Sequence, residues 1–274
     1  MRTTYTLFNV FGIPVTVDLS VLILMFILIS TFGDPFFGIL AGIILLISIL
    51  LHELGHSVVG MAFGGKVLEI RLMMLGGCAT MTAMPRKAWQ EILMAFAGPF
   101  VSILITGLSL VGLLFVPRPK MPLAADLLSY TAGLNFVLFV FNMLPAFPMD
   151  GGRILRATLQ QFFTTRLKAT WIASRIGRFV AILLALSVLF TWFFDTFRGF
   201  MLIRLLIAYM IYQTAEREYQ MVLAEEQGAR RNPFGFPFFG PRRNAPPPDD
   251  GQAVISPPPY RSRGTTRVDV HKEE

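Results

Sequence analysis

Long apolar runs separated by short polar segments make up most of the chain before residue 215. Six of these runs come close to the ~20 residues that an α-helix needs to cross a bilayer. They cover residues 15–32, 36–63, 89–116, 126–147, 176–194 and 198–215. The pattern predicts an all-α polytopic membrane protein with about six transmembrane helices.

A segment with a shorter period lies between the second and third runs. Residues 66–75 alternate polar and apolar side chains around Glu69 and Arg71, and Gly76-Gly77 follow. Alternation that two glycines interrupt predicts a short β-hairpin over residues 67–82. A hairpin edge at membrane depth is tolerated only inside protein or beside a watery cavity, so we expect this membrane-associated hairpin in one of those two places.

Composition supports the membrane assignment, since 54% of the 274 residues are hydrophobic and 15% are charged. An average soluble domain has about 25% charged residues. Residues 216–274 are instead rich in charge and contain the runs 246–248 and 257–259 of three prolines each. A segment of that composition cannot bury enough apolar surface to order itself. We therefore expect a membrane-embedded domain over residues 1–215 and a largely disordered, Pro/Arg-rich cytoplasmic tail over residues 216–274.

Positive charges flank the apolar runs unevenly, which orients them. The segments after the second and fourth runs hold Lys66, Arg71, Arg86, Lys87, Arg153, Arg156, Arg166, Lys168 and Arg175, whereas the opposite loops hold Arg118, Lys120 and Arg198. Lys and Arg accumulate in cytoplasmic loops, so both termini are expected in the cytoplasm, with the protein integral to the cell (inner) membrane. The net charge of +7 lies beside apolar segments, which makes the lipid bilayer the expected partner and not nucleic acid.

The sequence His52-Glu53-Leu54-Gly55-His56 carries the chemistry. Residues four apart lie on one face of a helix, so both imidazoles can bind one metal ion, with Glu53 in reach of a water on that ion. His52, Glu53 and His56 are the only ionisable side chains in residues 36–63, where each costs roughly 2.5–3.5 kcal/mol to insert. A hydrogen-bonded polar cluster between helices would explain the polarity but not the spacing of the histidines.

A catalytic zinc ion has three protein ligands and a water, so a third ligand is needed. His271 lies in the tail, and the best candidate is Asp150, in the block Asn142–Gly152. Pro145 and Pro148 break the preceding helix, which makes the backbone irregular where it can line a wet cavity. The two glycines after the aspartate permit a close backbone approach or a positive φ angle. Capping of the next helix is an alternative role that does not exclude metal binding.

Together these residues resemble the site-2 protease family of intramembrane zinc metalloproteases (peptidase family M50). The resemblance covers roughly residues 5–215 and rests on His52–His56, Ala97-Gly98-Pro99, Asn142–Gly152, Gly12-Ile13-Pro14 and the stretch from Phe63 to Gly77. It implies one zinc ion per chain held by His52, His56 and Asp150, with Glu53 as the general base. It also implies that the substrates are membrane-embedded proteins.

The chain differs from the family that it resembles in two respects. Family members often carry a paired nucleotide-sensing (CBS) module, and others carry a PDZ-like insertion; neither module is recognisable here. Where the family often has Ala-Asn after Ala97-Gly98-Pro99, this chain has Phe100-Val101-Ser102.

Asn142 is a further candidate for the site. It would hold the substrate backbone or polarise the substrate carbonyl, although an asparagine near a helix break also caps helix carbonyls.

Three other functions compete with intramembrane proteolysis. A metalloprotease acting on soluble peptides at the membrane face would use the same residues. A non-catalytic zinc scaffold or chaperone would need four closing ligands and no base, so Glu53 argues against it. A metal transporter would be expected to have inverted repeats, which the sequence does not reveal.

Overall fold

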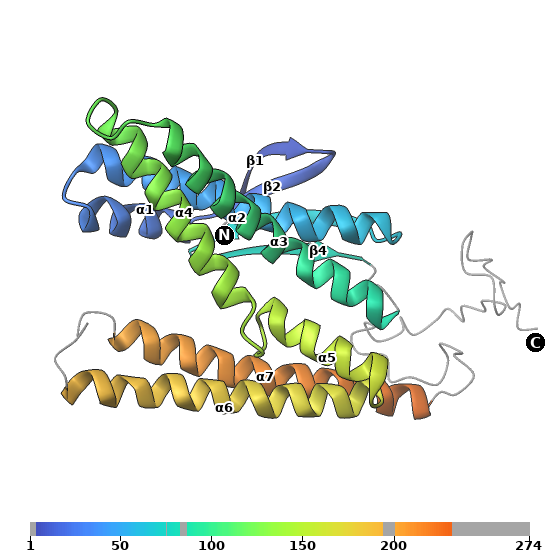
Figure 1. Cartoon of the computed structure of the whole chain (residues 1–274). Coiled ribbons are helices and arrows are strands. Elements are labelled where there is room, and N and C mark those ends of the chain that lie inside the picture. The colour runs from blue at the N-terminus through green and yellow to red at the C-terminus, as the bar shows by residue number, and fades with distance from the viewer. Residues whose placement is uncertain (1–3, 75, 83–86, 194–200, 232–274) are drawn as a thin grey trace, which may run out of the picture. The chain divides into compact units, whose positions relative to one another are not determined.

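The computed structural model describes residues 4–74, 76–82, 87–193 and 201–231 (Figure 1). Within these residues the chain forms seven helices and four strands. In chain order they are β1 (Thr4–Val10), β2 (Ile13–Asp18), α1 (Ser20–Thr31), α2 (Pro35–Ala62), β3 (Val67–Met73), β4 (Gly76–Met81), α3 (Ala88–Phe115), α4 (Pro122–Asn142), α5 (Asp150–Phe162), α6 (Arg166–Phe193) and α7 (Met201–Arg231).

Four of the predicted transmembrane runs are helices of sufficient length and apolarity to cross a membrane: α2, α3, α4 and, over Arg166–Val188, α6. The first predicted run is helical only from Ser20 to Thr31, which makes α1 an apolar helix of 12 residues. The last predicted run, 198–215, lies partly outside the described residues, and its described part belongs to α7. In the described residues the structure therefore supports a mostly helical membrane protein with four candidate spans rather than six.

The sheet is larger than the predicted hairpin. The hairpin over residues 67–82 is confirmed, because β3 and β4 pair in antiparallel fashion. A second antiparallel hairpin, β1–β2, joins it through parallel pairing of β2 with β3, in the order β1-β2-β3-β4. The prediction that residues 15–18 begin a transmembrane helix was therefore wrong. β-Branched residues predominate in β2, and Phe11 and Gly12, both with positive φ, form the turn before it.

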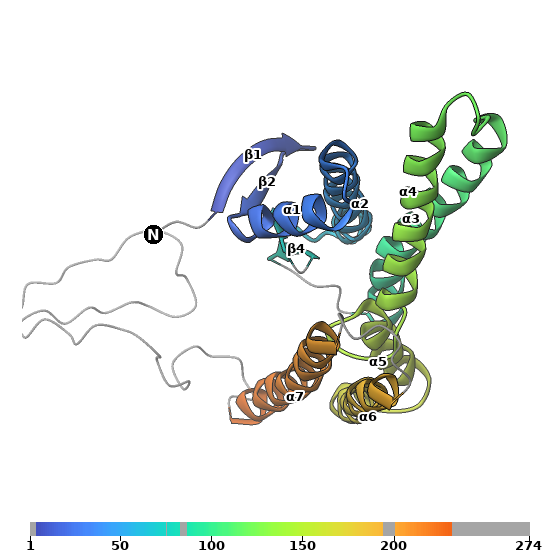
Figure 2. The same ribbon diagram turned by 90° about the vertical axis from the view of Figure 1, so that its left-hand side faces the viewer.

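Helix α2 packs against most of the elements that surround the site. It contacts α1, α3, α4, β3 and β4, and Figures 1 and 2 show the β1–β2 hairpin and α1 beside it. Its apolar face packs with the sheet in a core that includes Ile49, Val15 and Ile70. On the α3 side, a Cβ atom on Gly55 would lie 2.8 Å from the carbonyl oxygen of Ala97. Small residues thus let the two helix backbones approach closely.

The segment between α4 and α5 turns the chain back toward α2 and α3. α4 ends at Asn142, before the two prolines that were predicted to break it, and α5 starts at Asp150. Helices α6 and α7 follow (Figure 2), linked by an ion pair of 2.8 Å between Arg178 and Glu216. α7 continues to Arg231, beyond the predicted domain boundary at residue 215. The rest of the predicted tail, residues 232–274, lies outside the described residues.

Candidate metal centre

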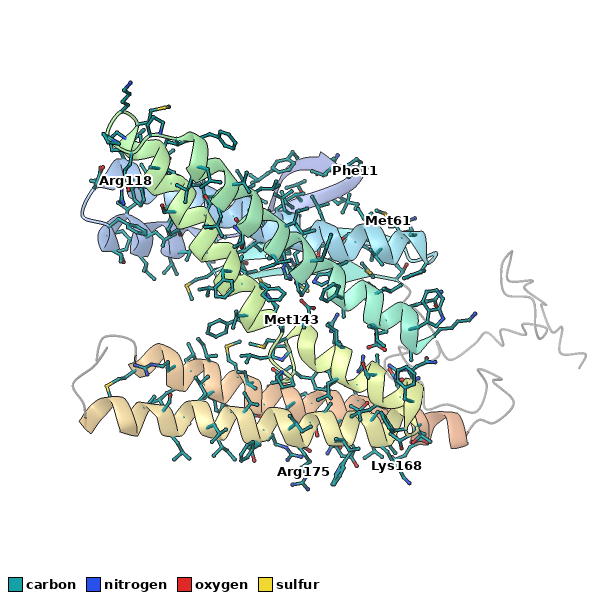
Figure 3. All side chains as sticks on the ribbon, viewed as in Figure 1. Phe11, Met61, Arg118, Met143, Lys168 and Arg175 are labelled. Atoms are coloured by element: carbon teal, nitrogen blue, oxygen red, sulfur yellow. The ribbon has the colours of Figure 1, made fainter. Side chains whose placement is uncertain are left out.

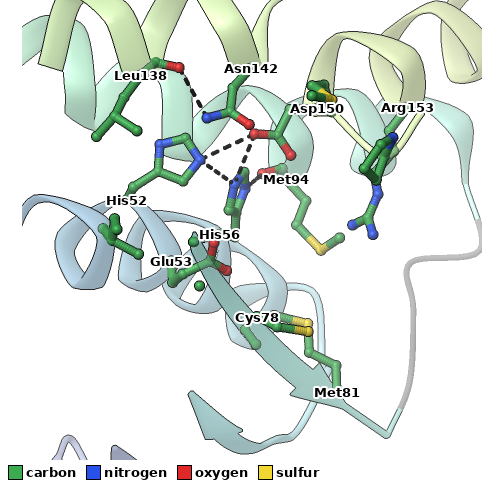
Figure 4. Close-up of a pocket in the computed structure, with 16 residues that line it drawn as sticks. His52, Glu53, His56, Cys78, Met81, Met94, Leu138, Asn142, Asp150 and Arg153 are labelled. Atoms are coloured by element: carbon green, nitrogen blue, oxygen red, sulfur yellow. Dashed lines mark hydrogen bonds and ion pairs between the residues drawn. The ribbon is translucent and has the colours of Figure 1, made fainter. Parts of the chain in front are cut away.

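Three predicted ligands converge from two distant parts of the chain. His52 and His56 lie one turn apart on α2, and Asp150 is the first residue of α5. Nε2 of His52 and Nε2 of His56 each lie 3.2 Å from Oδ2 of Asp150, and 3.2 Å from each other. The three donor atoms form a nearly equilateral triangle (Figure 4).

The size of this triangle fits a tetrahedral zinc ion. Zinc bonds to nitrogen and carboxylate oxygen are about 2.0–2.2 Å long, which separates neighbouring ligand atoms in a tetrahedron by about 3.3–3.5 Å. The observed separations of 3.2 Å fall just below this range. A metal site needs several His, Cys, Asp or Glu side chains close together. In the described part of the chain, one such group is found, and it consists of His52, His56 and Asp150. The arrangement matches a zinc site with one open position.

The hydrogen bonds behind the imidazoles orient their Nε2 atoms toward the triangle. Nδ1 of His56 donates to the carbonyl oxygen of Met94 at 2.7 Å, because a carbonyl can only accept. In its neutral form His56 then presents a lone pair on Nε2 to the carboxylate of Asp150. Two electron-rich atoms at that distance repel each other unless a cation lies between them. The donor set therefore suits a metal ion.

Ser102 supplies the matching contact for the second histidine. Its Oγ atom lies 3.0 Å from Nδ1 of His52 and is fully buried on α3. In the sequence, Ser102 stands out only as part of a departure from the family pattern. A polar residue one turn after Gly98 in an apolar helix could have indicated a functional role. The sequence does not reveal, however, that its partner is His52 of α2.

Glycines allow the three helices to meet at the ligands. A Cβ atom on Gly98 of α3 would lie 2.7 Å from Nε2 of His52 and would also overlap the imidazole of His56. A Cβ atom on Gly152 would lie 2.7 Å from the backbone of Ala146 and Phe147. Gly151 and Gly152 have no positive φ angle. Of the two roles predicted for the glycines after Asp150, close backbone approach is the one observed.

A cavity of about 320 Å³ opens beside the triangle and is lined by α2, β4, α3, α4 and α5 (Figure 4). Glu53 lines this cavity next to the ligands, and in the described part of the chain it makes no hydrogen bond or ion pair. Asn142 lines the opposite side, and its Nδ2 atom donates to the carbonyl oxygen of Leu138 at 3.0 Å. The asparagine thus makes the helix-capping contact and still faces the cavity.

Arg156 ties the helix that carries Asp150 to two other helices. Its guanidinium donates to Glu91 of α3 and, at 2.6 Å, to Glu218 of α7, and it stacks over Phe147. Burial by itself lowers the pKa of Arg156, but the two carboxylates, Glu91 first, raise it above its usual value. Arg156 lies in the segment between the fourth and fifth predicted runs, as expected, but its burial was not predicted. Its side chain is buried because the carboxylates of α3 and α7 compensate its charge.

Comparisons with known proteins agree on one family. The profile of peptidase family M50 matches residues 40–122 and 118–184. A zinc metalloprotease of Methanocaldococcus jannaschii is 34% identical over 82% of this chain and 63% of its own length. A relative from Synechocystis sp. is 32% identical over 62% of this chain and 48% of its own length.

Structural comparison gives a similar result. The solved site-2 protease from Methanocaldococcus jannaschii matches with a TM-score of 0.55 and 33% sequence identity, over 79% of this chain and 95% of the solved one. The aligned region spans about half to two thirds of the length of the curated relatives.

Proposed function

Because the chain belongs to peptidase family M50, we propose that it is an intramembrane zinc metalloendopeptidase that hydrolyses peptide bonds of membrane-embedded protein substrates. The observation that carries the proposal is the triangle of ligand atoms 3.2 Å apart, from the apolar helix α2 and the first residue of α5, beside a cavity that is also lined by Glu53. A site with three ligands leaves a position open for a water, as hydrolysis requires.

Four residues have distinct roles in this proposal. His52, His56 and Asp150 hold one zinc ion per chain, and Glu53 is the general base. When bound, the zinc supplies a water whose pKa is lowered to about 7. Glu53 takes the proton from this water and delivers it to the leaving amine. Its position one residue after His52 and its lack of a bonded partner in the described residues support this role.

The substrate is proposed to bind as an extended strand. β4 is an edge strand of the sheet and lines the cavity, so an unwound segment of a transmembrane helix can pair with its free edge. Asn142 lies across the cavity, where its Oδ1 atom and second amide hydrogen remain for the substrate backbone. This arrangement would place the scissile bond between β4 and the metal ligands.

The proposed topology has an even number of spans, α2, α3, α4 and α6 among them, so that both termini lie on the same side of the membrane. Figure 3 shows Arg118 at the turn between α3 and α4, and Lys168 and Arg175 on α6. Positive charge is in excess at the end of the molecule that contains Lys168 and Arg175. This excess favours a cytoplasmic location for that end and for both termini, in a protein of the cell membrane. Residues 1–215 would then form the embedded domain and residues 216–274 the cytoplasmic part, including the charged end of α7.

The test compares two isosteric changes, Glu53→Gln and Asp150→Asn. Glu53→Gln should retain zinc and lose about 10²–10⁴ in turnover, because an amide cannot accept the proton of the bound water. Asp150→Asn should bind zinc more weakly, because an amide is a poorer ligand than a carboxylate, and should regain part of its activity with excess zinc. Full activity in Glu53→Gln would contradict the role of Glu53 as the general base.

The substrate for this assay comes from the cell. Membrane proteins that accumulate uncleaved in cells carrying Glu53→Gln, compared with cells carrying the unchanged protein, are the expected substrates. Soluble peptides accumulating in place of membrane proteins would contradict the intramembrane assignment.

A further inference from the structure

Arg153 is the one Lys or Arg side chain among the described residues that line the cavity. It lies on α5 one turn after Asp150, and both project toward the cavity (Figure 4). In the described part of the chain its guanidinium makes no hydrogen bond or ion pair. Arg156, three residues later on the same helix, is by contrast bound by two carboxylates.

A half-buried guanidinium without an anionic partner is costly in a membrane protein. Met94 and Met81, which also line the cavity, offer no charge. Glu53 and Asp150 also line the cavity, but neither forms an ion pair with Arg153. The charge of Arg153 is therefore available for a group that enters the cavity.

The position of Arg153 limits where that group lies on a bound chain. Residues three apart on a helix have Cβ atoms about 5–6 Å apart, and an extended peptide advances about 3.3 Å per residue. A side chain that reaches Arg153 therefore belongs to a residue within about two positions of the bond held at the metal ligands.

We propose that Arg153 forms an anion-binding subsite that selects substrates with an Asp or Glu side chain within two residues of the scissile bond. A carboxylate accepts two parallel hydrogen bonds from a guanidinium, which makes an acidic side chain the matching partner for Arg153. The inference rests on the proposed function, because it places the anion relative to the zinc ligands. An arginine that only set the membrane orientation would not distinguish an acidic peptide from a neutral one.

Peptide hydroxamates are the probes, because the hydroxamate group chelates zinc and fixes the peptide relative to the metal. Three pairs carry Asp or Asn at the first, second or third residue from the hydroxamate. Their dissociation constants are measured with the zinc-loaded full chain in detergent. At one or two positions the Asp peptide should bind roughly ten- to a hundredfold more tightly than the Asn peptide, as expected for a hydrogen-bonded charge pair.

Variants assign this preference to Arg153. Arg153→Gln should abolish the difference between the Asp and Asn peptides, and Arg153→Glu should favour a Lys peptide at the same position. A gain of affinity for the Lys peptide cannot result from misfolding. Arg175→Gln, which removes an arginine stacked on Trp171 of α6, is the matched control and should keep the preference for Asp.

The outcomes separate the two proposals. Hydroxamates that fail to bind the zinc-loaded protein would contradict the proposed function. Hydroxamates that bind without any preference for Asp would overturn the anion-binding subsite alone. A preference that persists in Arg153→Gln, or that is lost in Arg175→Gln, would also overturn it.

Discussion

Gly98 of α3 packs so closely against His52 of α2 that a Cβ atom on residue 98 would lie 2.7 Å from Nε2 of the imidazole. The same atom would overlap the ring of His56. We predict that Gly98→Ala lowers zinc affinity by roughly a hundredfold or more, because both ligands must move and α3 cannot retreat without losing its packing on α2. Competition with a zinc chelator of known affinity measures the change.

Gly107→Ala is the matched control for this prediction. Gly107 lies on the same helix, and a Cβ atom there would meet no heavy atom within 4 Å. This variant should bind zinc as the unchanged protein does. Equal losses of zinc in the two variants would indicate a general effect of alanine on α3 rather than a contact with the ligands.

Ser102→Ala removes the hydrogen bond to Nδ1 of His52 and leaves the packing of α3 nearly unchanged. Loss of a hydrogen bond that orients a metal-binding histidine typically weakens metal binding about 10- to 100-fold. We predict a loss in this range, measured with the same chelator. Ser109→Ala, two turns further along α3 and also buried, should bind zinc normally. An unchanged affinity in Ser102→Ala would show that the contact of Ser102 with His52 does not contribute to metal binding.

The sequence predicted those parts of the site that depend on spacing within one element. His52, Glu53 and His56 lie within two turns of α2, so their mutual positions follow from helix geometry. Asp150 was predicted from a helix break followed by two glycines, and the structure brings it to the histidines. The β3–β4 hairpin followed from local alternation.

The contacts between elements could not be predicted in this way. Ser102 lies 50 positions from His52 along the chain, and no periodicity in α3 reveals which helix faces it. The burial of Arg156 was not predicted, because it depends on carboxylates in α3 and α7 that lie far away along the chain. The strand β2 was missed because its apolar residues extend directly into α1.

Arg156→Gln should destabilise the protein strongly. The change leaves Glu91 and Glu218 without their common cation, and both are largely buried. Removal of one partner from a buried ion pair typically costs about 3–5 kcal/mol. The apparent unfolding temperature in detergent should fall clearly. Arg118→Gln, whose pair with Asp126 is exposed, should change stability by less than about 1 kcal/mol. Similar stabilities in the two variants would contradict the role of Arg156.

The proposed topology is tested with single cysteines at Lys120 and Lys168, both exposed. Cys78 is the sole natural cysteine and is first changed to alanine. A membrane-impermeant thiol reagent should label Lys120→Cys in intact cells and Lys168→Cys only after the membrane is opened. The reverse pattern would invert the orientation of both termini.

Gly77 of β4 packs closely against Glu53, as Gly98 of α3 packs closely against the two histidines. A Cβ atom on residue 77 would lie 2.6 Å from Cγ of Glu53 and 2.8 Å from Cγ2 of Ile49. We predict that Gly77→Ala displaces the carboxylate and lowers turnover of the membrane substrate about 10²-fold, because proton transfer depends on the position of the base. Zinc content should stay at one ion per chain, since no ligand is touched. Gly133→Ala, in open space on α4, should be fully active. Loss of zinc from Gly77→Ala would mean that β4 supports the ligands instead of the base.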